Sequence, residues 1–298
     1  MNSLKRRDFL RTAGAAGVGF GLSGLAASRL LAADVAPGAP NAEKLGWRLG
    51  CEAWTFRLFP FFEAIDKVAS LGLHYIATGP GRSVRKDQPN VKFNESSSPV
   101  VVAEVKKRLA DAKMRMLSYW PTAFSKDAAS MRKVFDFAKE LGCEILTGEP
   151  AEDALDTIEK LCDEYQMKLA IHNHPNPSHY WNPDIVLKVC QGRSKRLGVC
   201  ADTGHWLRSG LNPIDCIKKL EGRITCFHFK DLDKMGSGAH DVPWGTGVCD
   251  VKGMLTEVHR QGLQAPFFAE YEYHWENSLP EIAQGVAYFD KVAAELSR

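Results

Sequence analysis

The stretch Val199-Cys200-Ala201-Asp202-Thr203-Gly204-His205 is an apolar run that ends in an aspartate and a histidine. Four other short apolar runs also end in His, Asp or Glu, at residues 145–149, 169–174, 226–231 and 268–272. Each has the length and composition of a buried strand with a polar residue at its C-terminal end. In parallel α/β proteins this end of the strands carries the functional residues, so the five runs predict one shared site.

Strand-like and helix-like segments alternate along the rest of the chain. We expect eight strands, at residues 47–56, 74–78, 114–120, 143–149, 168–174, 197–203, 224–231 and 266–272. Amphipathic stretches with helical spacing lie at residues 100–112, 128–141, 154–165 and 251–261, and long loops follow strands at residues 79–99, 175–183 and 233–250. About eight strand-then-helix units predict an α/β fold, a (β/α)8 TIM barrel. A doubly wound open sheet is the second choice, because no Gly-rich phosphate-binding motif follows the first strand.

The composition is that of an ordinary globular protein, with 45% hydrophobic and 25% charged residues among 298. The net charge of +2 does not favour a polyanionic partner, so we expect no nucleic acid partner. The eight cysteines form no Cys-x-x-Cys pair, and several lie inside apolar segments. We therefore expect most of them to be buried free thiols.

The N-terminus carries the twin-arginine motif Lys5-Arg6-Arg7-Asp8-Phe9-Leu10-Arg11, followed by a stretch rich in Gly and Ala. This pattern predicts a signal peptide over residues 1–36 and a single barrel domain over residues 37–298. The stretch contains too many glycines for a membrane anchor, so we expect no stable membrane span after cleavage. Export by the twin-arginine route would place the protein in the periplasm or outside the cell.

Inward-facing residues at the ends of neighbouring barrel strands converge above the barrel. Five polar residues fall at the ends of expected strands four to eight, namely Glu149, His172, Asp202, His228 and Glu270. Any one of them alone could be a surface group, but five on successive strands indicate a common site. Mixed carboxylate and imidazole ligands suit one divalent ion, Mn²⁺, Co²⁺, Zn²⁺ or Mg²⁺.

With these motifs the chain resembles the xylose isomerase-like TIM barrel superfamily, in the group called sugar phosphate isomerases and epimerases. The quoted Asp202–His205 segment is similar to the family's Asp-x-x-His after strand six, and His228 to its strand-seven histidine. The turn Pro243-Trp244-Gly245-Thr246-Gly247 resembles the family's Pro-x-Gly-x-Gly segment, and Glu270 its strand-eight glutamate. The resemblance implies that Asp202, His228 and Glu270 bind the metal.

One position departs from the family pattern. Many members have a metal-binding Glu at the end of strand five, where this chain has His172, while Glu149 ends the neighbouring strand. We predict that Glu149 replaces the missing carboxylate, giving Glu149, Asp202, His228 and Glu270 as the metal ligands. His172 is then either a further ligand or a proton-transfer group. Glu149 could instead be an ordinary charge at the start of a helix, because Pro150 follows it.

The remaining site residues are polar and aromatic groups near the strand ends or in the loops that follow them. The expected catalytic groups are His172, His174, Glu149 and Glu270. The expected substrate-binding residues are His205, Lys230, Trp54, Trp120 and Trp206. His205 could instead make a structural hydrogen bond, Lys230 could pair with Asp231 or another carboxylate, and each Trp could belong to the core. Glu52 could line the same pocket.

The resemblance implies a divalent-metal-dependent isomerase or epimerase that acts through an enediolate. Because the protein is expected to be exported, we expect a small carbohydrate that is not phosphorylated, such as a free sugar or keto-sugar. Loss of a β-leaving group from the same enediolate would make it a lyase or dehydratase on a 3-oxidised sugar or glycoside. A non-catalytic sugar-binding barrel and an apurinic-type endonuclease are weaker hypotheses, and an oligomer is compatible with the sequence.

Overall fold

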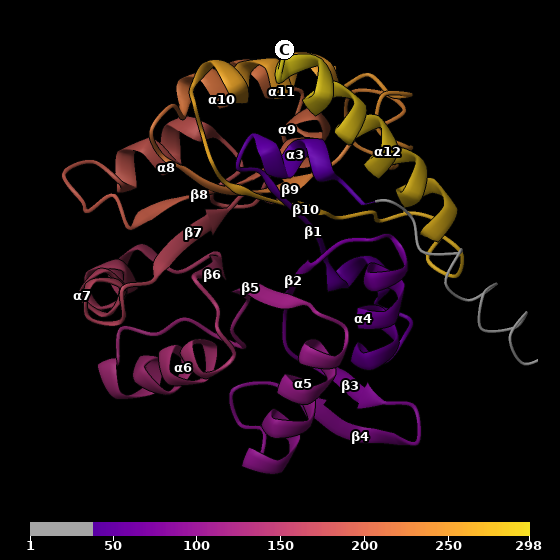
Figure 1. Cartoon of the computed structure of the whole chain (residues 1–298). Coiled ribbons are helices and arrows are strands. Elements are labelled where there is room, and N and C mark those ends of the chain that lie inside the picture. The colour runs from indigo at the N-terminus through magenta and orange to yellow at the C-terminus, as the bar shows by residue number, and fades with distance from the viewer. Residues whose placement is uncertain (1–37) are drawn as a thin grey trace, which may run out of the picture. The chain divides into compact units, whose positions relative to one another are not determined.

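The structure, a computed structural model, describes residues 38–298. The predicted signal peptide, residues 1–36, lies outside the described residues. Eight strands close into a barrel in the order β1-β10-β9-β8-β7-β6-β5-β2, and each neighbouring pair is parallel (Figure 1). They are β1 (Arg48–Glu52), β2 (Tyr75–Thr78), β5 (Arg115–Tyr119), β6 (Ile145–Gly148), β7 (Lys168–His172), β8 (Leu197–Asp202), β9 (Ile224–Phe229) and β10 (Pro266–Ala269). The predicted TIM barrel is confirmed.

After α3, which precedes β1, helices alternate with the strands along the chain and lie outside the barrel (Figure 1). The α-helices are α3 (Pro40–Lys44), α4 (Phe61–Ser70), α5 (Pro99–Asp111), α6 (Ala128–Glu140), α7 (Leu155–Tyr165), α8 (Pro183–Val189), α9 (Thr203–Arg208), α10 (Pro213–Lys219), α11 (Val251–Arg260) and α12 (Leu279–Leu296). Two 3₁₀ helices are η1 (Ala53–Phe56) and η2 (Glu152–Ala154). Among residues 38–298, no helix is long and apolar enough to cross a membrane.

The apolar core has two parts. The larger part includes residues of both the strands and the helices that pack outside them. The smaller part lies on the strands alone and forms a plug of one residue from each of seven strands: Ala77, Leu117, Ile145, Ala170, Cys200, Cys226 and Phe268. The plug fills the barrel, so any cavity must lie beyond it, at a strand end.

All eight cysteines are buried and free, as the sequence predicted. Cys200 and Cys226 belong to the plug, where they act as small apolar side chains.

Two segments differ from the sequence-based expectation. The expected strand at residues 47–56 ends at Glu52, whose carboxylate accepts a hydrogen bond from the Trp54 amide and starts η1. The expected loop at residues 79–99 contains an antiparallel hairpin, β3 (Arg82–Arg85) and β4 (Gln88–Phe93). Its polar residues and a proline hide the strand pattern. Packing of Phe93 on Phe61, with ring centroids 5.2 Å apart, anchors the hairpin to the core.

Candidate active site

The ends of β7, β8, β9 and β10 form one wall of the site. The plug residues on these strands are followed, two residues later, by four buried polar side chains: His172, Asp202, His228 and Glu270. Because alternate residues of a strand point to the same side, these four lie directly above the plug. The structure thus brings four of the predicted site residues together at the strand ends.

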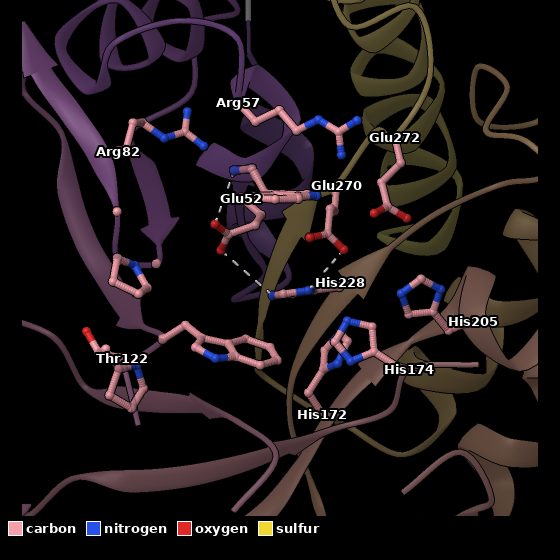
Figure 2. A pocket seen from close by; sticks show the side chains of 16 residues that line it. Glu52, Arg57, Arg82, Thr122, His172, His174, His205, His228, Glu270 and Glu272 are labelled. Carbon is pink, nitrogen blue, oxygen red and sulfur yellow. Dashed lines mark hydrogen bonds and ion pairs between the residues drawn. The ribbon is translucent and has the colours of Figure 1, made fainter. Parts of the chain in front are cut away.

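All four side chains offer atoms suited to a metal ion. One ligand atom each from His172, Asp202, His205 and Glu270 can be chosen so that all lie within 4.8 Å of one another. Within residues 38–298, the Nε2 atom of His172 and both ring nitrogens of His228 are buried without a well-formed hydrogen bond, and the carboxylates that face them, those of Asp202, Glu270 and Glu52, lie 3.5, 3.2 and 3.9 Å away. Buried polar atoms are rarely left unpaired, so these nitrogens suit a ligand. His228 Nδ1 lies 3.2 Å from Glu270 Oε2 (Figure 2).

Glu149 belongs to a different group. Its Oε1 atom accepts hydrogen bonds from His174 Nδ1 at 2.5 Å and from the His174 amide at 3.0 Å, and it lies 3.4 Å from His172 Nδ1. Ser178 Oγ donates to the other carboxylate oxygen at 2.7 Å. The close groups of candidate ligands place Glu149 with His172 and His174, and not with Asp202 or Glu270. The expected four-ligand set that included Glu149 is therefore not assembled as one group.

In the Glu149–His174 pair the carboxylate is ionised and the imidazole carries the shared proton. Although burial opposes it, hydrogen bonds from His172, His174 and Ser178 hold the pKa of Glu149 well below its usual range. The ionised carboxylate can only accept, so His174 Nδ1 carries the proton and its Nε2 atom is the remaining base. Burial opposes protonation of His174, but the hydrogen bond to Glu149 dominates and raises the pKa of the imidazole.

Lys230, the residue after β9, is fully buried between carboxylates. Its ammonium nitrogen lies 2.5 Å from Asp202 Oδ2 and 3.3 Å from Glu272 Oε2, and it forms an ion pair with Glu270 Oε2. Burial opposes the charge, but these carboxylates raise the pKa of Lys230. The side chain does not line the cavity, and its partners are the carboxylates of Asp202, Glu270 and Glu272, with no bond to Asp231.

His205 has a defined tautomer. Arg208 Nη1 lies 3.0 Å from His205 Nδ1, and a guanidinium can only donate, so Nδ1 accepts and Nε2 carries the proton. Burial, together with Lys230 and His172 nearby, outweighs the attraction of Asp202 and lowers the pKa of His205, which stays neutral. An Nε2–H group cannot bind a metal, but it can donate a hydrogen bond to a substrate oxygen. This leaves His172, Asp202 and Glu270 as the close metal-type group.

A cavity of about 540 Å³ opens beside these residues (Figure 2). One side of its lining carries the predicted residues His172, His174, His205, His228 and Glu270. Trp54, Trp120 and Glu52, at the end of β1, complete the lining, and Glu52 Oε2 lies 3.9 Å from His228 Nε2. Trp120 packs edge-on against His172 and His174, with ring centroids 5.2 and 5.9 Å apart. Trp206 is 1% exposed and does not line the cavity, so the structure places it in the core.

The cavity is also lined by Glu272 and by two arginines that the sequence analysis did not single out, Arg57 and Arg82. Arg57 follows η1, and Arg82 begins β3 in the unexpected hairpin. Their position in strand-to-helix loops was the available signal, because such loops surround barrel active sites. Glu272 lies two residues after Glu270, and this alternation predicts that both face the same side.

The turn at residues 243–247 is clamped by Asp231, the residue after Lys230. The Asp231 carboxylate accepts hydrogen bonds from the amides of Gly245, Gly247 and Cys249 at 2.9, 2.9 and 3.0 Å. A Cβ at Gly247 would collide with the Leu232 carbonyl oxygen, so only glycine fits there. This turn therefore has a structural role, which is to hold the loop beyond β9 against the barrel.

The chain belongs to the xylose isomerase-like TIM barrel family, whose model matches residues 65–292. A search of curated proteins gave no match. An uncharacterized protein from Parabacteroides distasonis has a similar structure, with 32% identity and a TM-score of 0.66, over 82% of this chain and 98% of that one.

Two further solved structures share the fold at 15% identity. One is a xylose isomerase-like TIM barrel protein from Mycobacterium smegmatis in complex with magnesium, with a TM-score of 0.67 over 85% of this chain and 98% of that one. The other is a D-tagatose 3-epimerase-like protein, with a TM-score of 0.63 over 84% of this chain and all of that one. At this identity the likeness shows the fold alone.

Proposed function

We propose that this protein is a divalent-metal-dependent isomerase or epimerase that acts through an enediolate on a sugar or keto-sugar without a phosphate group. The observation that carries the proposal is the group of His172, Asp202 and Glu270 beside a cavity lined by tryptophans. Aromatic faces pack well on the C–H surfaces of sugars, and a few polar groups then orient the ligand.

The donor set fits a divalent cation. His172 Nε2 is buried without a well-formed hydrogen bond, and Asp202 and Glu270 contribute carboxylate oxygens. These three side chains would hold the ion, with His228 beside Glu270. When bound, the ion supplies Lewis-acid polarisation of a sugar carbonyl. Support also comes from two solved neighbours, one of which binds magnesium and the other, IOLI, zinc.

Proton transfer is assigned to groups on both walls of the cavity. His174 Nε2 is the free base, because Glu149 holds the proton on Nδ1. His174 therefore removes the proton next to the sugar carbonyl. Glu52 lines the cavity from β1, and burial raises its pKa, so it can hold a proton and return it to the substrate. His205 Nε2–H donates a hydrogen bond to a substrate oxygen.

A lyase or dehydratase that acts on a 3-oxidised sugar or glycoside is the second candidate. The same two groups would serve, with His174 removing the proton and Glu52 protonating the leaving oxygen. Solved structures with this fold include L-ribulose 3-epimerase, at 11% identity, and a "probable 3-DHS dehydratase" from Bacillus anthracis, at 14%. The fold therefore accommodates both reaction types.

We also propose that residues 1–36 direct export by the twin-arginine route. The supporting observation is the Arg6-Arg7 pair and the Gly/Ala-rich stretch that follows it. Export of a folded protein would suit a chain that takes up its metal before it leaves the cytoplasm. It also favours substrates without phosphate, since phosphorylated sugars are cytoplasmic intermediates.

The test is deuterium exchange. The purified mature protein is loaded with Mn²⁺, Co²⁺, Zn²⁺ or Mg²⁺ and incubated with free and 3-oxidised sugars in D₂O. NMR should show deuterium at a carbon next to a carbonyl. Asp202→Asn and Glu270→Gln should abolish both bound metal and exchange, whereas Glu140→Gln on the surface of α6 should not. Exchange that survives metal removal or both site variants would overturn the proposal.

A further inference from the structure

Two arginines line the cavity on the side away from the histidines. Figure 2 shows Arg57 and Arg82 beyond Glu52, with His172, His174 and His205 across the cavity. Within residues 38–298, neither guanidinium has a carboxylate oxygen within the 4.0 Å that defines an ion pair. Most other arginines of the described chain are paired, as Arg208 is with Asp241 and Glu272. Two guanidinium groups without an ion pair therefore face one cavity, where a ligand anion could pair with them.

Arg82 is held in place but not neutralised. Its Nη1 atom donates to the Phe56 carbonyl oxygen at 2.9 Å, which is its one hydrogen bond to the protein among residues 38–298. A guanidinium has five N–H donors, so most of its donors are available to a ligand. Burial lowers its pKa to about 10, and the group is still a cation at neutral pH.

Arg57 is held by aromatic rings. Its guanidinium carbon lies 3.3 Å from the ring centroid of Trp275 and 5.1 Å from that of Trp54. Stacking on a ring face uses the flat side of the guanidinium and leaves the N–H groups at its edge free. The two tryptophans therefore restrict this side chain without cancelling its charge, which is the preorganisation that a binding group needs.

Two carboxylates line the same cavity, those of Glu270 and Glu272, and both contact the ammonium of Lys230, which offsets their charge. Figure 2 shows Arg57 on the side of Glu270 and Glu272, and Arg82 on the other side of Glu52. An anion near Arg57 and Arg82 would meet donors that no carboxylate of residues 38–298 holds in an ion pair. The volume of about 540 Å³ lies within the range of roughly 300–1,000 Å³ that holds drug-sized ligands. A ligand can therefore reach both walls.

We propose that Arg57 and Arg82 form a subsite for a singly charged oxyanion on the substrate, so that the natural substrate is an acidic sugar. This inference rests on the proposed function, because it takes the substrate to be a sugar. The fork of a guanidinium matches the oxygens of a carboxylate or a sulfate ester. A doubly charged phosphate is disfavoured because the carboxylates of Glu270 and Glu272 line the same cavity. The oxyanion then orients the sugar with its reacting carbons toward the histidines.

The test compares ligands that differ in one group. Binding of 4-nitrophenyl β-D-glucuronide and 4-nitrophenyl β-D-glucoside to the mature protein is measured by calorimetry at low and high salt. We expect the glucuronide to bind about tenfold more tightly at low salt, since a charge-assisted pair contributes roughly that much. Glucose 6-sulfate and glucose 6-phosphate, compared with glucose, separate the kinds of anion, and the phosphate should show the smaller gain.

Variants assign the effect to the two arginines. Arg57→Gln and Arg82→Gln should each remove most of the preference for the glucuronide and leave the affinity for the glucoside nearly unchanged. Arg85→Gln is the matched control, because Arg85 lies on the same strand as Arg82 but contacts Gln88 and Glu104. Arg57 is exposed, so its variant should fold even if the Arg82 variant does not.

Failure of the oxyanion subsite can be told apart from failure of the proposed metal-dependent reaction. Equal binding of the two glycosides, or a preference that survives Arg57→Gln, would overturn the acidic-sugar subsite. If neutral keto-sugars then still exchange deuterium in a metal-dependent way, the proposed function stands without it. If acidic sugars bind through the arginines but no sugar exchanges deuterium, the subsite stands and the proposed reaction fails.

Discussion

The two walls of the cavity are built on different principles. The wall from β7 to β10 carries charges that already satisfy one another, because Lys230 joins Asp202 and Glu270 in the buried interior. The second wall comes from loops after β1, β2 and β5, and neither of its cations, Arg57 and Arg82, has a carboxylate oxygen within 4.0 Å among residues 38–298.

The difference suggests a division of labour. Strand ends hold side chains rigidly, which suits chemistry that needs exact distances. Loops on a barrel vary more freely, which suits recognition of a particular substrate. We therefore expect substitutions in the wall from β7 to β10, the strand wall, to affect folding, metal binding and turnover. Substitutions in the wall formed by the loops after β1, β2 and β5, the loop wall, should affect substrate affinity and the choice of substrate.

The largest expected effect is that of Lys230→Met. The change leaves two buried carboxylates, Asp202 and Glu270, without their cation, which we expect to cost about 3–5 kcal/mol in free energy of unfolding. It should also strengthen binding of a divalent cation, because the ammonium no longer competes for these oxygens. Urea unfolding with and without Mn²⁺ measures both effects.

The control for this variant is Lys219→Met, which removes an exposed ion pair with Asp184. Its cost should not exceed about 1 kcal/mol. A Lys230→Met protein that is as stable as the wild type without metal would contradict the view that the strand wall neutralises itself through this lysine.

A smaller effect is expected from Glu149→Gln, which should lower turnover roughly 10- to 100-fold. Glu149 raises the pKa of His174 above the usual 6.5, and the base works when deprotonated. Activity should therefore increase as pH rises through a midpoint above 6.5. In the variant this midpoint should move down, because the carboxylate no longer stabilises the protonated imidazole. A pH–rate profile of both proteins checks the sign.

Glu152→Gln is the matched control for that experiment. Glu152 also contacts a histidine, His179, at 2.8 Å, but both side chains are exposed and neither lines the cavity. Its pH–rate profile should coincide with that of the wild type. An unchanged midpoint in Glu149→Gln would exclude His174 as the titrating base.

The smallest effect belongs to the loop wall. Trp120→Leu removes an aromatic ring beside His172 and His174, and we expect a loss of about 0.5–1.5 kcal/mol in substrate affinity. The change should appear in KM more than in kcat. Trp206→Phe, at a buried position outside the cavity, should leave KM unchanged. A fall in kcat alone for Trp120→Leu would assign this ring to the catalytic wall.

Much of the fold could be predicted because it depends on local patterns. The eight strands lie within the expected apolar runs, and in five of them His, Asp or Glu lies at or directly after the strand end. The hairpin of β3 and β4 was missed because it is polar and is stabilised by distant packing of Phe93 on Phe61. Local periodicity contains no information about such a contact.

The sequence predicted which polar residues lie at the strand ends, but it did not predict which of them lie in contact with one another. His172, Asp202, His228 and Glu270 meet as expected, since two-residue alternation along a strand determines which side chains point inward. Glu149 was predicted as both a metal ligand and a catalytic group, and the structure places it beside His174 and Ser178. The sequence contained both possibilities, and nothing local distinguished them.

The sequence by itself determined the barrel and the set of polar residues at its strand ends, because both follow from the alternation of residues along single strands. Only the tertiary structure decided how those residues pair. Closure of the barrel places Lys230 between the carboxylates of two other strands, and loop packing brings Arg57 and Arg82 to one wall. Charge pairing depends on distances of a few ångströms between residues far apart in the chain, and these distances exist only after the barrel has closed.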